Sequence, residues 1–200
     1  IKEIRIHLLF YTDVLEKGWV EGDDAEILRF LMSPEILALL PDIPKGNIGE
    51  WGETNLPDGT DLGLGDDSAS RAVQAAVNKL GTPYSQAHRD DGDYFDCSSL
   101  TYYCYLEAGI SLMYQGSNTA ASQAKLLEDR GCSVAYEDIV PGDLIFYSFE
   151  RNGRYKNISH VAMYVGNGMV IDASSSKGCV VYRRIYSVSD IVACGRPALL

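Results

Sequence analysis

A cysteine and a distant histidine are the residues of this sequence best suited to nucleophilic chemistry. Cys97 stands in Asp96-Cys97-Ser98-Ser99-Leu100, directly after a polar loop and at the expected first turn of a helix. The positive end of a helix dipole favours a thiolate over a thiol at such a position. Far downstream, His160 opens an alternating segment that is typical of a strand. A thiolate with a histidine base is the core of a thiol hydrolase.

A third polar residue, Asp172, joins this pair if the chain forms a hairpin around Gly166-Asn167-Gly168. With these residues as a three-residue loop, His160 and Asp172 lie on the same face of the hairpin. They are then diagonal neighbours with centres about 7–8 Å apart, which long side chains can bridge. Asp172 would hold one imidazole nitrogen and leave the other for Cys97. A two-residue loop would turn Asp172 to the opposite face and break the contact.

Each of these residues also has an ordinary structural interpretation. His160 could be a hydrogen-bonded strand histidine, and Asp172 a surface carboxylate, although an acid among apolar strand neighbours needs a partner. His7 is an alternative base, but it lies in an apolar segment where packing is the simpler interpretation. His88 lies in an acidic loop, which is a weak metal candidate.

Composition describes a globular chain with one main domain. The 200 residues are 46% hydrophobic, enough for one core and an appendage. The formal net charge of −11 argues against nucleic acid as a partner, because phosphates need a basic face. The sequence contains no apolar run of about 18 residues, so we expect no transmembrane helix in this chain. The chain opens on Ile1 without a signal peptide, and we expect a preceding segment that could carry an export signal.

The five cysteines are odd in number and have no CxxC or CxxH spacing. A structural zinc site and a disulfide framework are therefore not expected. A single bridge, such as Cys179 with Cys194, stays open as an alternative, and Cys104 is interpreted as a buried apolar residue. Asp58-Gly59-Thr60-Asp61 resembles part of a calcium loop but lacks the closing glutamate of an EF-hand.

The elements that must position these residues follow from the change of periodicity along the chain. Residues 1–40 predict a small helical N-terminal extension, and the Pro- and Gly-rich residues 41–67 a linker or wrapping loop. Helices are predicted over 68–80, 97–108 and 119–130, and strands over 144–149, 160–165, 169–174, 178–183 and 190–194. Helices followed by antiparallel strands predict an α+β domain over residues 68–200.

Four motifs, taken in order, resemble the NlpC-type superfamily (NlpC with its p-sixty relatives). They are Gly81-Thr82-Pro83-Tyr84, Phe95-Asp96-Cys97-Ser98-Ser99-Leu100, Pro141-Gly142-Asp143-Leu144-Ile145-Phe146 and Ser159-His160-Val161-Ala162-Met163-Tyr164-Val165-Gly166-Asn167-Gly168. The resemblance covers about residues 68–197. It implies a papain-like NlpC-type fold and a cysteine peptidase of bacterial cell walls. Members cleave peptidoglycan stem peptides, typically between D-glutamate and the diamino acid.

The resemblance also implies catalytic roles. Cys97 is then the nucleophile and His160 the base. Asp172 occupies a third position where the family usually has histidine, asparagine or glutamine, and a carboxylate there would hold the imidazolium more strongly than an amide. Tyr84 matches the tyrosine whose hydroxyl supports the oxyanion site. Such a mechanism requires no metal and no cofactor.

The same resemblance implies a substrate site beside the nucleophile. Asp96 and Ser98 match residues that bind the amine and backbone of the stem peptide's first L-alanine, and Ser99 stands at the family's usual glycine. After the tyrosine, Ser85-Gln86-Ala87-His88 replaces the common tryptophan and glycine pair, which changes the cleft wall. This variant looks like hydrolases carried by conjugative elements of Gram-positive bacteria.

The expected function is a peptidoglycan hydrolase with a Cys-His-Asp thiol mechanism. We expect a monomer that meets its substrate outside the cell or in the wall. Two other functions stay open. A CHAP-type amidase or cross-bridge peptidase would use the same chemistry on a different bond. A catalytically weak wall-binding module would keep the fold without the reaction, given the unusual third residue and cleft wall.

Overall fold

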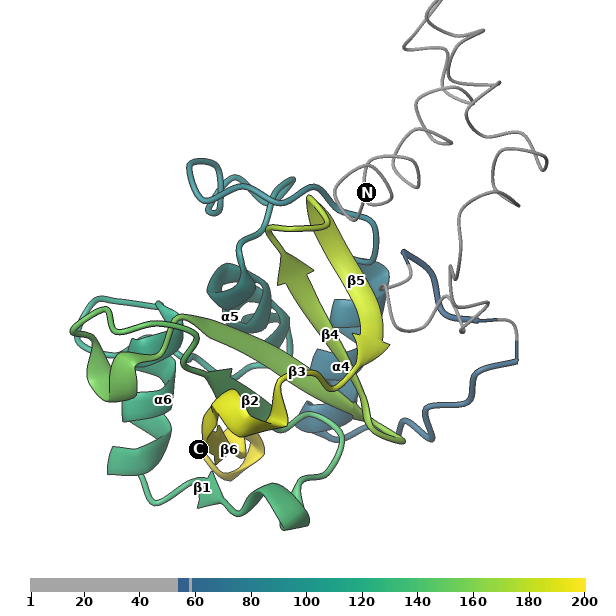
Figure 1. The fold of residues 1–200 in the computed structure, drawn as a ribbon. Coiled ribbons are helices and arrows are strands. Elements are labelled where there is room, and N and C mark those ends of the chain that lie inside the picture. Colours follow the sequence, from purple (N-terminus) through teal and green to yellow (C-terminus); the bar gives the residue numbers. More distant parts are fainter. Residues whose placement is uncertain (1–53, 58) are drawn as a thin grey trace, which may run out of the picture. The chain divides into compact units, whose positions relative to one another are not determined.

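The computed structural model describes residues 54–57 and 59–200, which belong to a compact unit spanning Ile48–Leu200. The predicted helical extension and residues 41–53 of the predicted linker lie outside the described residues. Within them, helices come first and antiparallel strands follow (Figure 1). The elements are helices α4 (Ser68–Asn78), α5 (Cys97–Glu107) and α6 (Ala120–Asp129), and strands β1 (Ser133–Val134), β2 (Leu144–Tyr147), β3 (His160–Gly166), β4 (Met169–Ser174), β5 (Cys179–Arg184) and β6 (Ile191–Gly195).

Each helix begins directly after a polar residue that caps it. Asp67, Asp96 and Thr119 each accept a backbone N–H from the first turn of the helix that follows. This bond satisfies one of the N–H groups that a helix start leaves unpaired. The predicted helix starts at 68 and 97 are confirmed, and the third helix begins one residue later because Thr119 is its cap.

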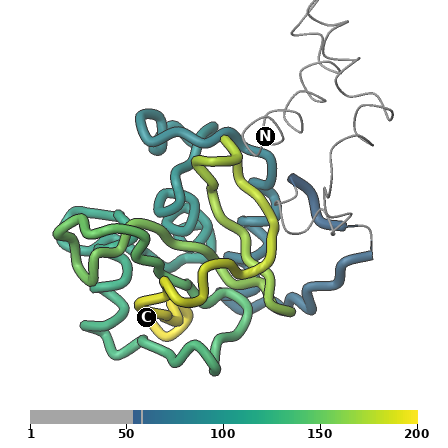
Figure 2. The backbone as a smooth tube through the Cα atoms, viewed as in Figure 1, coloured from purple at the N-terminus to yellow at the C-terminus, as the bar shows by residue number. Residues whose placement is uncertain are grey.

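The six strands form one antiparallel sheet in the order β1-β6-β2-β3-β4-β5. α5 packs against β3 and β4, while α6 packs against β6 and β2, and Figure 2 traces the same path from helices to strands. Phe146, Met163 and Ile171 point to the helices and share their buried core. Ala162 and Val170 point to the other face and belong to a smaller cluster. The predicted α+β fold is confirmed.

The turn of the β3–β4 hairpin differs from the prediction. Gly166 pairs with Met169, so the turn consists of Asn167 and Gly168 alone. Both residues have positive φ angles, 53° and 72°. Positive φ at both positions is the requirement of a tight two-residue hairpin turn, which asparagine and glycine meet at low cost. The three-residue loop was therefore wrong.

A bulge in β3 compensates for the shorter turn. The register shifts between Tyr164 and Gly166, so β3 contains one residue more than its partner at this point. Beyond the bulge, the strands pair in the predicted register, with Met163 opposite Ile171. Asp172 therefore stays on the same face as His160, although the turn is one residue shorter than predicted.

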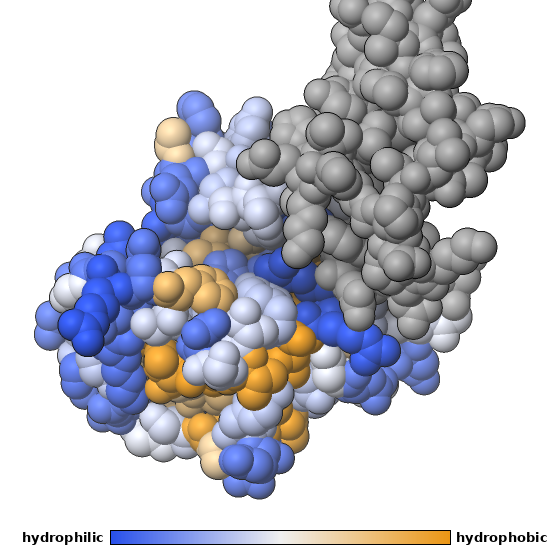
Figure 3. Space-filling model, in the orientation of Figure 1, coloured by the Kyte–Doolittle hydropathy of each residue, from blue (hydrophilic) through white to orange (hydrophobic). Residues whose placement is uncertain are grey.

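The cysteines are free thiols, and Cys179 and Cys194 lie on β5 and β6, which three other strands separate in the sheet. The alternative of a bridge between them was therefore wrong. Among the described residues, no helix combines the length and the apolar character needed to cross a membrane. The face seen in Figure 3 is largely hydrophilic, with an apolar strip in the region of β6, where Val188 and Val192 are exposed.

Candidate active site

Cys97 is the first residue of α5, and its side chain is partly exposed. The carboxylate of Asp96 accepts the backbone N–H groups of Ser98 and Ser99 at 3.0 and 2.7 Å. In return, Ser99 Oγ accepts the backbone N–H of Asp96 at 2.9 Å, which closes a capping box. These bonds fix the start of the helix and hold Cys97 at its positive end.

The three residues predicted to contact substrate surround this helix start. Asp96 and Ser98 are each 4% exposed, and Ser99 is fully buried. Ser98 Oγ donates to Asp96 Oδ1 at 3.0 Å. Because the hydroxyl of Ser99 is buried and bonded within the capping box, this side chain stabilises the first turn of the helix.

Arg89 occupies the second oxygen of Asp96, a contact outside the sequence-based predictions. Its Nη1 lies 3.0 Å from Asp96 Oδ2. Its Nη2 donates to Asn118 Oδ1 at 2.6 Å. Arg89 thereby ties the loop after Tyr84 to the start of α5 and to the segment before α6. The sequence marks this loop as acidic. Arg89 is its one arginine, and that was the available signal for an ion pair with a nearby carboxylate.

His160 and Asp172 are in direct contact. His160 Nε2 lies 2.7 Å from Asp172 Oδ2, and the side chains are 14% and 0% exposed. The proximity that the hairpin register predicted is present. Because Nε2 is bonded to Asp172, Nδ1 is the ring nitrogen that remains for Cys97, whose negative charge acts on the imidazole. The structure thus brings together a thiol, an imidazole and a carboxylate from α5, β3 and β4.

The electrostatics of these three groups favour charge separation. Burial lowers the pKa of His160, but the negative charge of Cys97 and the hydrogen bonds to Asp172 and Cys97 outweigh burial and raise this pKa to about 10. Burial raises the pKa of Asp172, yet the hydrogen bond from His160 and the positive charges of His160 and Arg183 together bring it below its ordinary value. An imidazolium bonded to an ionised Asp172 is the state that these two shifts favour.

Two further residues outside the sequence-based predictions hold Asp172. Arg183 donates from Nε to Oδ1 at 3.0 Å and from Nη2 to Oδ2 at 2.6 Å. The hydroxyl of Tyr186 donates to Oδ2 at 3.1 Å. Asp172 pairs with Val181 across β4 and β5, so Arg183 is its diagonal neighbour on the same face. A basic residue after the apolar run of β5 was the available signal.

Tyr84 lies near the nucleophile. Its backbone N–H donates to the carbonyl of Gly178 at 2.7 Å, and it forms an isolated bridge with Phe95, just before the helix. Burial raises the pKa of Tyr84, and the negative charges of Cys97 and Asp96 raise it further. The phenol therefore keeps its proton at neutral pH and can act as a hydrogen-bond donor.

An aromatic layer covers one side of the imidazole. Tyr147 stacks on Tyr186 with ring centroids 4.9 Å apart and on Phe149 at 5.6 Å. The His160 ring lies 6.0 Å from Phe149 and 5.9 Å from Tyr147. Phe149 is 48% exposed, so the outer edge of this layer faces solvent beside the reacting groups. The layer shields the His160–Asp172 contact from water, which strengthens it.

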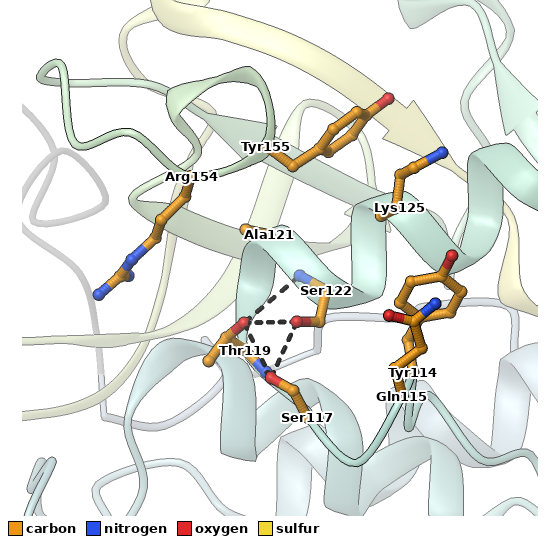
Figure 4. Close-up of a pocket in the computed structure, with 9 residues that line it drawn as sticks. All are labelled: Tyr114, Gln115, Ser117, Thr119, Ala121, Ser122, Lys125, Arg154 and Tyr155. Atoms are coloured by element: carbon orange, nitrogen blue, oxygen red, sulfur yellow. Dashed lines mark hydrogen bonds between the residues drawn. The ribbon is translucent and has the colours of Figure 1, made fainter.

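A separate hollow of about 370 Å³ lies at the N-terminal end of α6 (Figure 4). It is lined by Tyr114, Gln115, Ser117, Thr119, Ala121, Ser122, Lys125, Arg154 and Tyr155. The hydroxyl groups of Ser117, Thr119 and Ser122 bond with one another, as the dashed lines of Figure 4 indicate. Cys97, His160 and Asp172 are not among its residues, so the hollow is distinct from the thiol site.

The predicted weak metal candidate around His88 contains a simple polar pair. His88 Nδ1 lies 2.9 Å from Asp91 Oδ2, and both side chains are exposed. Within residues 54–57 and 59–200, no group of three His, Cys, Asp or Glu side chains is arranged to hold a metal ion.

Comparison with known proteins returns one family and a consistent set of relatives. The NlpC/P60 family model matches residues 81–189. A probable endopeptidase of Mycobacterium tuberculosis is 34% identical over 113 residues, which are 56% of this chain and 25% of that protein. The peptidoglycan DL-endopeptidase CwlO of Bacillus licheniformis is 32% identical over 125 residues, 57% of this chain and 25% of CwlO. The matched region thus spans about a quarter of the length of these curated relatives.

Solved structures give the same result for the fold. NlpC2 from Trichomonas vaginalis superposes with a TM-score of 0.56 at 30% identity, covering 70% of this chain and 48% of that one. The peptidoglycan hydrolase RipB from Mycobacterium tuberculosis has a TM-score of 0.51 at 25% identity, covering 64% of each chain.

Proposed function

The chain belongs to the NlpC/P60 family, and on this basis we propose that it is a cysteine peptidase that hydrolyses peptidoglycan stem peptides. One observation carries the proposal: His160 is bonded through Nε2 to the buried Asp172, and the negative charge of Cys97 raises the pKa of the same ring. This is the arrangement of nucleophile, base and orienting group that amide hydrolysis needs. The relatives CwlO and RipB, named as a peptidoglycan endopeptidase and a peptidoglycan hydrolase, support the substrate class.

The first chemical step uses the thiolate. Cys97 Sγ attacks the carbonyl carbon of the scissile amide, and negative charge develops on the carbonyl oxygen. The backbone N–H of Cys97 belongs to the first turn of α5, where N–H groups lack intrahelical acceptors, and can donate to this oxygen. The protonated Tyr84 hydroxyl is the second donor. Each donor of this type contributes about 2.7–4 kcal/mol to transition-state stabilisation.

The second step uses the imidazolium. His160 protonates the leaving amine, which breaks the C–N bond and leaves an acyl group on Cys97. The neutral ring then removes a proton from water, and the hydroxide releases the acyl group. Asp172 holds the ring in one orientation through both steps. We propose that the bond cleaved joins D-glutamate, through its γ-carboxyl group, to the diamino acid.

The residues beside the nucleophile shape the neighbouring subsite in this proposal. Asp96 and Ser98 flank Cys97 and would border the first L-alanine of the stem peptide. Ser99 acts through the helix start, because its side chain is fully buried. The enzyme would work as a monomer, outside the cell or in the wall.

The proposal is tested with Cys97→Ala on purified peptidoglycan. We expect release of soluble fragments to fall on the order of 10⁴-fold or more, because no other group supplies the nucleophile. Cys179→Ala, which removes the other partly exposed thiol, is the matched control and should keep full activity. Unchanged release by Cys97→Ala would exclude the thiol mechanism.

Mass spectrometry of the products separates the alternatives. A new amino terminus on the diamino acid supports the proposed bond. A product cut elsewhere in the stem or cross-bridge supports a CHAP-type amidase or cross-bridge peptidase, and wall binding without products supports a binding module.

A further inference from the structure

We propose that Arg183 is a positioning residue that keeps Asp172 ionised while the charge of His160 changes during the reaction. The inference rests on the proposed function, because it concerns the same imidazole. Three donor groups contact a single oxygen of Asp172. Asp172 Oδ2 receives His160 Nε2 at 2.7 Å, Arg183 Nη2 at 2.6 Å and the hydroxyl of Tyr186 at 3.1 Å.

Because Asp172 is buried, its carboxylate needs a permanent positive charge beside it to stay ionised. The carboxylate is fully buried, and an ionised group there is costly without a counter-charge. His160 supplies a charge only while it is an imidazolium. Once it has protonated the leaving amine it is neutral, and Asp172 would then be an uncompensated buried anion. A guanidinium keeps its charge throughout.

The position of Arg183 is well defined. Its guanidinium makes two hydrogen bonds to the two oxygens of Asp172, the geometry in which arginine binds carboxylates most specifically. Its Cζ lies 3.9 Å from the ring centroid of Tyr186. Its side chain is only 14% exposed, so solvent screens the pair weakly. Arg183 thus holds the carboxylate through both of its oxygens.

The other charged and titratable groups around this pair come from four segments. Cys97 faces His160 from α5, and Tyr147 faces Asp172 from β2. Tyr186 follows β5. Lys177 lies in the turn between β4 and β5, where burial lowers its pKa and the charge of Arg183 lowers it further. Arg183 is therefore the cation in direct contact with the carboxylate.

The sign of the effect follows from Coulomb's law. Removing a positive charge near His160 stabilises its imidazolium, so the ring would lose its proton at higher pH. The limb of the pH profile of hydrolysis that reports the loss of this proton should therefore move upward with it. A purely structural role of Arg183 would lower stability without moving this limb.

The test combines kinetics with NMR titration of the His160 ring nitrogens in the whole chain. Arg183→Gln should raise the His160 titration midpoint, and the limb of the profile that reports it, by about one pH unit. Arg183→Lys keeps the charge without the bidentate geometry, so its midpoints should stay near those of the wild type while the rate falls. Arg184→Gln removes an exposed arginine from the next position of β5, and it should change neither midpoint.

An unchanged His160 midpoint in folded Arg183→Gln would overturn the inference. Because the titration needs no turnover, this result is distinguishable from a failure of the proposed function, which is lack of hydrolysis by the wild type. If Arg183→Gln does not fold, Arg183→Met decides, because it also removes the charge but keeps a long side chain beside Asp172. A His160 midpoint equal to that of the wild type in folded Arg183→Met would contradict the proposal.

Discussion

Three of the five thiols are buried, and their surroundings keep them from reacting. Burial and a nearby carboxylate raise the pKa of Cys104 far above its ordinary value, and burial together with the charges of Asp143 and Glu137 raises the pKa of Cys194 to about 12. Cys97 differs because it stands partly exposed at a helix start with an imidazole beside it. At the scale of single residues, the environment of each side chain decides its chemistry.

The role proposed for Tyr84 gives a prediction at this scale. Tyr84→Phe removes the hydroxyl but keeps the ring, so kcat should fall about 10²–10³-fold while KM changes little. Steady-state hydrolysis of a soluble muropeptide measures this effect. Tyr94→Phe, in the exposed part of the same loop, is the control and should retain its rate. Equal kcat values for Tyr84→Phe and the wild type would remove Tyr84 from the oxyanion site.

At the scale of elements, two local features position the site residues. The capping box at Asp96 and Ser99 sets the direction of the first turn of α5. The bulge between Tyr164 and Gly166 sets which face of the hairpin carries Asp172. Without that extra residue, the two-residue turn would place the carboxylate on the helix-facing side of the sheet.

The capping box can be tested with Ser99→Ala. The backbone N–H of Asp96 would lose its buried acceptor, so we expect the free energy of unfolding to fall by about 1 kcal/mol. Urea denaturation followed by circular dichroism measures the change. Ser189→Ala, which removes an exposed hydroxyl, should stay within about 0.5 kcal/mol of the wild type. A loss no larger than that of the control would mean that the box contributes little to stability.

At the scale of the described unit, the turn before β2 joins the helices to the sheet. Gly142 has a φ angle of 96°, and its carbonyl accepts the hydroxyl of Tyr105 from α5 at 2.5 Å. A Cβ at this position would lie 2.7 Å from Ala69 Cβ in α4. The close approach lets α4, α5 and the start of β2 share one buried core.

This contact predicts a large penalty for Gly142→Ala. Gly153→Ala is the matched control, because Gly153 also has a positive φ angle, 70°, but open space around its Cβ position. Both variants carry the backbone strain, and only Gly142→Ala adds overpacking, so it should be the less stable of the two by about 1–3 kcal/mol. Equal stability of the two variants, measured by denaturant unfolding, would show that α4 moves away at little cost.

Much of the site could be predicted because its signals are local. Asp96 as a helix cap and Cys97 in the first turn follow from neighbouring residues. The register that brings Asp172 to His160 follows from the alternation of apolar and polar residues along β3 and β4. This alternation fixes the pairing of the two strands even though the predicted length of their connecting turn was wrong. The turn itself could not be predicted, because a tight turn with a bulge and a longer loop give the same alternation.

The sequence by itself determined the candidate catalytic residues and the fold class, because capping and strand periodicity act over a few residues. Only the tertiary structure decided which charges meet: Arg183 with Asp172 across two strands, and Arg89 with Asp96 across a loop. Ion pairs of this kind depend on where separate elements pack, and a charged residue carries no local mark of its partner. The burial of Ser99 was decided in the same way, by packing around the start of α5.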